Sequence, residues 1–396
     1  MALDSRVIHD VSELERWFGA WRELLSRSAA DEPTRSPLWL GAWWRVFGAL
    51  EGRKLRVALF LDGARLVGVA PLLGRRKWHF PAIPFDRFEL LGTGEPEADE
   101  ICSDHLGLVA ERGSEEAVAE ALVRLLTRDE LGRWDELVLS SLDADDPTLS
   151  ALERAFENAG IAVERTITGA CPYVALPPSF DEYLAALRSE RRYLVRRSLR
   201  DFERWANGES ELLRAGSRSE LETGKRVLEA LHRERWSAEG RKGVFASARF
   251  RAFHDEVMQA LLDEGALDLS WLSVRGRPIA ASYNVVWNGR VHFYQSGRSF
   301  DVPKGVRPGI VLHALAIRRA IEAGLREYDF LAGTSQYKLE LATNTRSIAR
   351  VRAVRARLKE GARGVAERSL ERVKRLRDSV RSAVVERAAE AGTEPR

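Results

Sequence analysis

The sequence predicts an α/β protein built from two domains and a helical tail. Its 396 residues are enough for two separate hydrophobic cores. In both halves, apolar residues recur with the period of strands and with the period of helices, and the two kinds of element mix along the chain. Pro177-Pro178 separates the halves. We therefore expect domains at residues 1–176 and 177–355, followed by a charged helical tail at residues 356–396.

Composition narrows the class of protein. Hydrophobic residues make up 45% of the chain, charged residues 31%, and the formal net charge is +3. So small an excess of positive charge argues against a dedicated nucleic-acid binder. Cys102 and Cys171 are the only cysteines, which gives no set of four metal ligands and fits a reducing compartment. No stretch reaches the ~18 apolar residues that span a bilayer. We expect a cytoplasmic protein without a bound metal.

The first half opens with two predicted helices and a hairpin. Apolar residues at helical spacing mark residues 11–25, and Ser36-Pro37 begins a second helix whose aromatic residues we expect in the core. Strands at 55–60 and 66–72 are joined by Asp62-Gly63, a strong signal for a tight turn.

Two short apolar runs, at 88–91 and 106–109, predict further strands on either side of an acidic loop. Asp104-His105 ends that loop, next to the second run. A loop that places Asp104 at a strand edge fits either a substrate cleft or a solvated surface. The half is completed by a helix at 115–126, a strand at 134–139 and a helix at 146–159.

A single long helix is predicted at residues 180–206. Arg191 lies on its apolar stripe, between Leu187 and Leu194. A guanidinium on an apolar face needs a partner, because an unpaired charge there is very unfavourable. The partner is either an internal carboxylate or an anionic group of a substrate. Two more helices are expected at 221–237 and 250–262, with a loop at 236–244 between them.

Residues 267–341 carry the strongest pattern in the chain. Alternation over residues 279–287 predicts a strand, Asn288-Gly289 a type I′ turn, and residues 291–294 the returning strand. A polar loop at 299–306 then leads to a helix pattern that begins at Pro308.

The start of this helix suits an anion. Pro308 near the first helical position costs nothing there, because the first turn has spare N–H donors. Those N–H groups, together with the helix dipole and adjacent basic side chains, favour a phosphate or pyrophosphate. A surface helix that binds nothing would show the same spacing. The residues expected at this site are Lys304, Arg307, Gly309, Ile310 and Val311.

A strand at 348–354 precedes the tail, which is densely charged and has sparse apolar residues at a/d-like spacing. Such spacing fits an exposed helix or a weak coiled coil that docks on a protein partner, and equally a solvated tail.

The motifs of the second half are Gly276 to Ala281, His292 to Gly297, Pro308-Gly309, Tyr328 to Gly333 and Tyr337-Lys338; those of the first are Ser36 to Leu40, Leu66 to Leu72 and Leu90 to Gly94. In this order they resemble the CelD/BcsL-type acetyltransferases of the GNAT superfamily, which are related to the FemAB peptidyltransferases. The resemblance covers residues 10–355. It implies two GNAT-like units in tandem, with mixed central sheets flanked by helices, and an acyl donor bound in the second unit.

The resemblance also implies residue roles. In GNAT enzymes the pyrophosphate of the donor binds at the N-terminus of the helix after the fourth strand, which matches Arg307, Gly309 and Ile310 here. Tyr337 matches the tyrosine that protonates the departing thiolate. Lys338 resembles a lysine that FemAB-type relatives place near the reacting centre, where a fixed cation steadies negative charge.

The expected reaction is direct transfer of an acetyl or other acyl group from acetyl-CoA to an amine or hydroxyl. The family context suggests a sugar or polysaccharide precursor as acceptor. A base within hydrogen-bond reach must take the acceptor's proton, and His292 and Asp329 are the candidates. Arg191 and Asp104 are the candidate acceptor contacts.

Two alternatives remain open. Val311 stands where the usual GNAT signature has a small residue, so an aminoacyl-tRNA donor, as in FemAB relatives, is possible and would be the one nucleic-acid partner. A degenerate GNAT pair that binds without catalysing, and that assists assembly in exopolysaccharide synthesis, is the second alternative.

Overall fold

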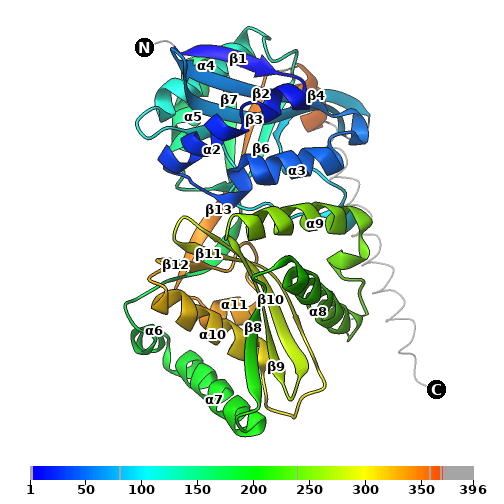
Figure 1. Cartoon of the computed structure of the whole chain (residues 1–396). Helices are drawn as coiled ribbons and strands as arrows, with labels where there is room; N and C mark the ends of the chain where they lie inside the picture. Colours follow the sequence, from blue (N-terminus) through cyan, green and yellow to red (C-terminus); the bar gives the residue numbers. More distant parts are fainter. Residues whose placement is uncertain (1–2, 80–81, 239, 356–357, 366–367, 369–396) are drawn as a thin grey trace, which may run out of the picture.

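We describe a computed structural model of the chain, which covers every residue except 1–2, 80–81, 239, 356–357, 366–367 and 369–396. A mixed sheet of 13 strands runs through the described part, and helices pack on both of its faces (Figure 1). The path of the sheet is β1-β2-β3-β4-β6-β13-β7-β12-β11-β10-β9-β8, with β5 paired to β3. The predicted α/β class is confirmed.

Apart from the two-residue strand β5 in the first half, the two halves repeat one order of elements. A strand and helices lead to three antiparallel strands, a helix, a parallel strand, a helix and a last strand. The first half consists of β1 (Asp4–Ile8), α1 (Val11–Glu15), α2 (Phe18–Arg27), α3 (Pro37–Phe47), β2 (Lys54–Asp62), β3 (Arg65–His79), β4 (Ile83–Leu90), β5 (Val109–Ala110), α4 (Glu115–Thr127), β6 (Glu136–Asp143), α5 (Pro147–Asn158) and β7 (Ala162–Ala175). The second half consists of α6 (Phe180–Ala186), α7 (Ser189–Ala206), β8 (Ser210–Arg214), α8 (Arg218–Ala238), α9 (Ala248–Asp263), β9 (Leu267–Val274), β10 (Arg277–Trp287), β11 (Arg290–Arg298), α10 (Pro308–Glu322), β12 (Glu327–Asp329), α11 (Gln336–Leu341) and β13 (Asn344–Val354). The repeat supports the expected tandem arrangement, with α6 and α7 added ahead of the second copy.

The last strands of the two halves change places in the sheet. β7 ends the first half yet pairs with β12, while β13 ends the second half yet pairs with β6. β7 and β13 also pair with each other along their length. Backbone hydrogen bonds therefore join the halves into one sheet. The division at residue 176 stays a prediction.

Most predicted elements are found where the pattern placed them. The strand expected at 106–109 is wrong, because only Val109 of that run lies in a strand, β5, and two predicted helices are each divided into two. The helix expected at 11–25 is divided between α1 and α2. The helix expected at 180–206 breaks at Leu187, whose backbone is extended, so α6 and α7 are separate. The break lets α6 bury Tyr183 and Leu184 while α7 buries another face, and the Tyr183 hydroxyl donates to the carbonyl of Leu341 at 2.9 Å. Tertiary packing here overrides a continuous helical pattern.

The aromatic residues of α3 lie in the core as expected, with Trp39, Trp43 and Phe47 fully buried. No helix among the described residues is long and apolar enough to cross a membrane. Of the tail, residues 358–365 are helical, and most of the remaining tail prediction lies outside the described residues.

Candidate functional site

The site begins where two parallel strands separate. β11 and β12 pair only at Arg290–His292 and Glu327–Asp329. Beyond this point β11 continues along β10, whereas the chain after β12 turns away toward α11. A cavity of about 360 Å³ lies at this opening, between the end of β11, the start of α10 and α11.

A β-bulge in β11 decides which side chains face the cavity. Tyr283 pairs with Gln295 and Asn284 with Phe293, so Tyr294 is the extra residue. Phe293 packs on His313 of α10, whereas Tyr294 packs on α9 across the sheet. After the bulge the alternation is shifted by one residue, so that the residues lining the α10 face are Ser296 and Arg298.

Gly297, between these two residues, faces the other side of the sheet, where α8 packs against it. A Cβ there would come within 2.3 Å of the backbone nitrogen of His232 on α8. Only glycine permits this close approach of helix and strand. Gly297 therefore lets α8 pack closely on β11, the strand whose residues Ser296 and Arg298 line the cavity.

The first turn of α10 offers backbone donors to the cavity. Arg307 is the N-cap residue, and no side chain caps the helix. The first hydrogen bond within the helix runs from the Val311 N–H to the Arg307 carbonyl at 3.1 Å. The N–H groups of Gly309 and Ile310 precede it and have no acceptor within the helix. A Cβ added at Gly309 would meet only the Arg298 side chain, at 3.7 Å, so the space above this turn is open.

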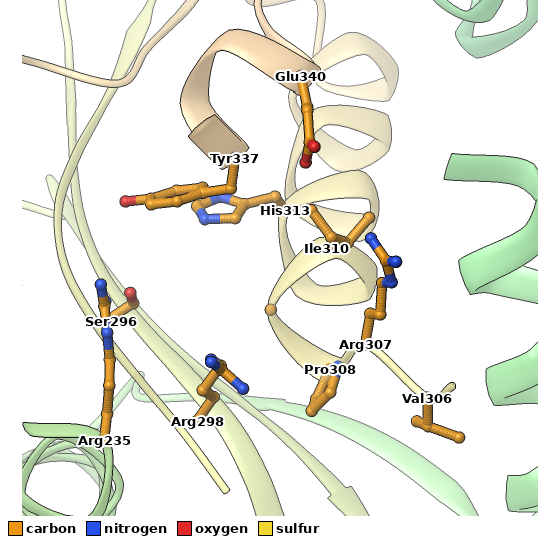
Figure 2. Close-up of a pocket in the computed structure, with 11 residues that line it drawn as sticks. Arg235, Ser296, Arg298, Val306, Arg307, Pro308, Ile310, His313, Tyr337 and Glu340 are labelled. Atoms are coloured by element: carbon orange, nitrogen blue, oxygen red, sulfur yellow. The ribbon is translucent and has the colours of Figure 1, made fainter. Parts of the chain in front are cut away.

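Three arginines and one carboxylate line the cavity. Arg235 comes from α8, Arg298 from β11, Arg307 from the cap of α10, and Glu340 from α11 (Figure 2). Arg307 is exposed and makes no ion pair with another described residue. The positive excess adds to the positive end of the α10 dipole, so the cavity attracts an anion.

Tyr337 closes the far end of the cavity. Its ring stacks on the imidazole of His313, with centroids 5.5 Å apart. In Figure 2 the Tyr337 hydroxyl points to the side of the cavity where Ser296 and Arg235 lie. Burial raises the pKa of Tyr337, against a smaller lowering effect of Arg235. The phenol therefore keeps its proton at neutral pH and can donate it.

The structure brings Arg307, Gly309, Ile310 and Tyr337 together, and it places Val311 and Lys304 differently. Val311 is the fourth residue of the helix, so its N–H is already bonded, and its side chain is fully buried. Lys304 is exposed in the loop before α10 and is not among the lining residues.

Lys338 follows Tyr337 in sequence, but its side chain donates hydrogen bonds to backbone carbonyl groups. Its Nζ donates to the carbonyl of Ala332 at 2.7 Å and to that of Leu331 at 3.3 Å. Burial lowers the pKa of Lys338, and the nearby Asp104 opposes that effect. These bonds hold the segment between β12 and α11.

His292 and Asp329 lie in a buried polar cluster rather than at the cavity. His105 Nε2 is 3.0 Å from Asp329 Oδ2, and Arg346 donates to the same oxygen at 2.9 Å. Burial alone would raise the pKa of Asp329, but the charged His105 outweighs it and holds that pKa well below its usual range. Burial lowers the pKa of His292 to about 3, so this imidazole is neutral.

His105, Cys171 and Asp329 bring one possible metal-ligand atom each to within 4.8 Å of one another, all of them buried. Asp329 already accepts bonds from Arg346 and from the Leu331 N–H at 2.7 Å. The guanidinium beside the carboxylate disfavours a second cation. We assign this cluster to the support of the β12 end.

The two residues expected to contact the acceptor, Asp104 and Arg191, have different environments. Asp104 is buried, and its Oδ2 accepts the Ala332 N–H at 2.8 Å, which ties the first half to the segment after β12. Burial raises the pKa of Asp104. Arg191 is half-buried at the start of α7 and has no ion pair with another described residue.

Sequence reasoning missed Arg235, Ser296, Arg298, His313 and Glu340 as lining residues. Arg298 and Ser296 depend on the bulge, which gives no clear local signal. Arg235 reaches the cavity from a helix whose own pattern is that of an exposed face. A Gly297 between two polar residues at a strand end was the one available hint.

Comparison with known proteins agrees with this geometry. Residues 189–339 match the family Acetyltransf_6, described as an acetyltransferase (GNAT) domain. A search of curated proteins finds no match. The matched region holds the strand opening, the α10 N-terminus and Tyr337. Residues 189–339 are therefore a GNAT acetyltransferase domain by sequence.

Among solved structures, the fold resembles that of FemX, with a TM-score of 0.58 at 11% identity, covering 89% of this chain and 98% of FemX. A conserved protein of unknown function from Bacteroides thetaiotaomicron VPI-5482 gives a TM-score of 0.49 at 12% identity, covering 85% of this chain and 97% of that protein. The C-terminal domain (DUF2156) of a putative lysylphosphatidylglycerol synthetase from Agrobacterium fabrum gives 0.48 at 12% identity, covering 87% and 92%. The comparison with FemX shows a FemX-like fold over most of the chain, and the GNAT domain match covers residues 189–339. CelD/BcsL-type character is an expectation from sequence.

Proposed function

We propose that the protein transfers an acyl group, with acetyl as the simplest case, from acyl-CoA to an amine or hydroxyl. The observation that carries the proposal is the open first turn of α10. Its two unbonded N–H groups and an exposed arginine face a cavity that ends at a protonated tyrosine.

The donor's diphosphate would bind at the Gly309 and Ile310 amides, with Arg307 as its charged partner. Backbone N–H groups at a helix start and a positive dipole end suit a diphosphate. Gly309 leaves room for phosphate oxygens to reach the backbone. Lys304, exposed in the preceding loop, would add long-range attraction without contact.

The pantetheine arm would then run along the opening between β11 and the segment after β12. A neutral amine or a hydroxyl of the acceptor attacks the thioester carbon. A C–N or C–O bond forms, and the C–S bond breaks. The electron pair of that bond leaves with sulfur, and Tyr337 supplies the proton to the thiolate. Such positioned acids contribute about 10²- to 10⁴-fold in rate.

We propose positioning roles for His292, Asp329 and Lys338. None of the three lines the cavity, and Asp329 and Lys338 bond to the segment between β12 and α11. That segment leads directly into Tyr337. Their effect on the reaction would come through the placement of the phenol, and the acceptor's proton would leave to water in the cavity.

For the acceptor we keep the sugar or polysaccharide precursor that the sequence resemblance implies. Arg191 and Asp104 remain proposals as acceptor contacts. If the acceptor is not a sugar, the proposed roles of the α10 start and Tyr337 toward acyl-CoA stay the same.

A thiol-release assay tests the function. The full chain is mixed with acetyl-CoA and a panel of amino sugars, neutral sugars and simple amines, and free CoA is followed. The proposal expects acceptor-dependent release that saturates with acetyl-CoA. Binding of acetyl-CoA without release for any acceptor would favour the degenerate binding protein. Absence of acetyl-CoA binding, with transfer from an aminoacyl-tRNA, would favour the FemAB-like reaction.

A further inference from the structure

A second cavity, of about 390 Å³, adjoins the first one at the start of α10. It lies between α7, the loop before α10, and α11, and both cavities are lined by Arg307 and Glu340. Figure 1 shows α7 beside α10, and the two helices are in contact. A ligand whose diphosphate rests at Arg307 would therefore extend from one cavity into the other.

The wall supplied by α7 presents an aromatic ring and a cation on adjacent turns. Tyr193 is 57% exposed, which is unusual for so large a ring, and it lines the cavity. Arg197, four residues on, lines the same cavity and is held by Asp201 at 3.3 Å. Residues four apart on a helix lie on one face, so ring and guanidinium are neighbours.

The opposite wall is polar and partly acidic. Gln336 and Glu340 come from α11, and Glu190 adds a third acceptor from the first turn of α7, on the same side as Tyr193. The oxygens of these side chains accept hydrogen bonds from an exocyclic amine, and the two carboxylates repel a phosphate. These acceptors suit the exocyclic amine of an adenine beside Tyr193, and with Arg307 engaged by the diphosphate, Arg197 is the lining cation left for a further phosphate.

We propose that this second cavity binds the 3′-phosphoadenosine end of acyl-CoA, with the adenine stacked on Tyr193 and the 3′-phosphate paired with Arg197. The inference rests on the proposed acyl-CoA donor and adds where its nucleoside binds. The α7 helix has no counterpart in the first half, so the site belongs to the half that carries the donor cavity. Base stacking on an aromatic ring and a charge-assisted phosphate contact are each worth about tenfold or more in affinity.

Calorimetric titration of the full chain with three probes separates these contacts: CoA, 3′-dephospho-CoA and 4′-phosphopantetheine. The wild type should bind CoA about tenfold more tightly than 3′-dephospho-CoA. Arg197→Gln should remove that difference, because it weakens CoA and leaves 3′-dephospho-CoA unchanged. Tyr193→Ala should weaken both nucleotides and leave 4′-phosphopantetheine unchanged.

The matched control is Arg200→Gln, an exposed arginine on α7 that does not line the cavity. It should bind all three probes as the wild type does. The assignment is overturned if CoA binds to the wild type but Arg197→Gln and Tyr193→Ala bind every probe unchanged, or if 4′-phosphopantetheine binds as tightly as CoA. Failure of the wild type to bind CoA at all would instead overturn the proposed donor, and the inference with it.

Discussion

The imidazole of His313 and the phenol ring of Tyr337 are stacked, with centroids 5.5 Å apart and an interplanar angle of 21°. His313 lies one turn beyond Ile310 on α10, and its Nδ1 is 3.1 Å from the hydroxyl of Tyr328, a contact that fixes the ring. Burial lowers the pKa of His313 to about 3, so it stacks as a neutral ring. The helix that offers the anion site therefore also holds the proposed acid in place.

Replacing Tyr337 by Phe should lower kcat with little change in affinity for acetyl-CoA. The ring and its stacking on His313 are kept, whereas the proton for the thiolate is lost, so we expect a fall of about 10²-fold or more. Steady-state thiol release and calorimetry measure the two quantities separately.

Tyr173→Phe serves as the control, since Tyr173 is half-buried on β7 and is not a lining residue of the cavity. It should keep wild-type turnover. Full activity of Tyr337→Phe would remove Tyr337 as the acid.

Gly309→Ala should weaken acetyl-CoA binding without a loss of stability. An alanine Cβ would meet only the Arg298 side chain, at 3.7 Å, and alanine favours a helix by about 1 kcal/mol over glycine. The same methyl group would stand where a phosphate must approach the amides. Thermal unfolding with and without acetyl-CoA measures both effects, and a variant with unchanged affinity would mean that no ligand reaches this turn.

Asp329→Asn should cost about 3–5 kcal/mol of stability, because it leaves the buried His105 without its carboxylate, whereas Arg346 keeps Glu327 and Asp143. Urea unfolding measures the loss. Asp301→Asn, which removes an exposed partner of Arg277, should be close to wild type. A loss below about 1 kcal/mol for Asp329→Asn would show that the cluster does not hold the β12 end.

Stability should fall as pH drops below about 6.5. Burial lowers the pKa of His254, His292 and His313 to about 3. Between these values the unfolded chain binds protons that the folded chain does not, so unfolding becomes easier as pH falls. From pH 6.5 to 5 each histidine contributes on the order of 2 kcal/mol.

His105 acts in the opposite direction. Burial would lower its pKa, but Asp329 raises it well above the usual value, so its contribution is full below pH 6.5 and is lost as pH rises through the raised value. Urea unfolding between pH 5 and 8 measures the curve. His254→Phe, set among Phe250 and Phe253, should reduce the slope on the acid side, and an unchanged slope would mean that His254 is not kept neutral.

Local signals predicted the second half best. Asn288 and Gly289 both have positive φ, as a type I′ turn requires, and Pro308 begins α10 as its fixed φ suggests. These features depend on a few neighbouring residues, so the sequence shows them directly. The uncapped first turn of α10 could be predicted for the same reason, while its anion binding stays a prediction.

Features that join distant segments could not be predicted. The pairing of β7 with β13 matches residues such as Cys171 and Arg346, and nothing local marks such a partner. The sequence offers His292, on the hairpin strand, and Asp329, at the end of the next strand, as candidate bases. Both are buried against residues of other elements, among them His105 and Arg346. Packing between distant segments decides whether a side chain reaches a site. The spacing of apolar residues along the sequence does not show this packing.

The central claim is that the start of α10 binds the diphosphate of acyl-CoA. The most direct measurement is calorimetric titration of acetyl-CoA into the wild type and Arg307→Glu, with Arg326→Glu, an exposed arginine outside the cavity, as control. The account predicts one site per chain, a loss of affinity of about tenfold or more for Arg307→Glu, and none for Arg326→Glu. Equal affinity of all three proteins, or no binding by the wild type, would contradict it.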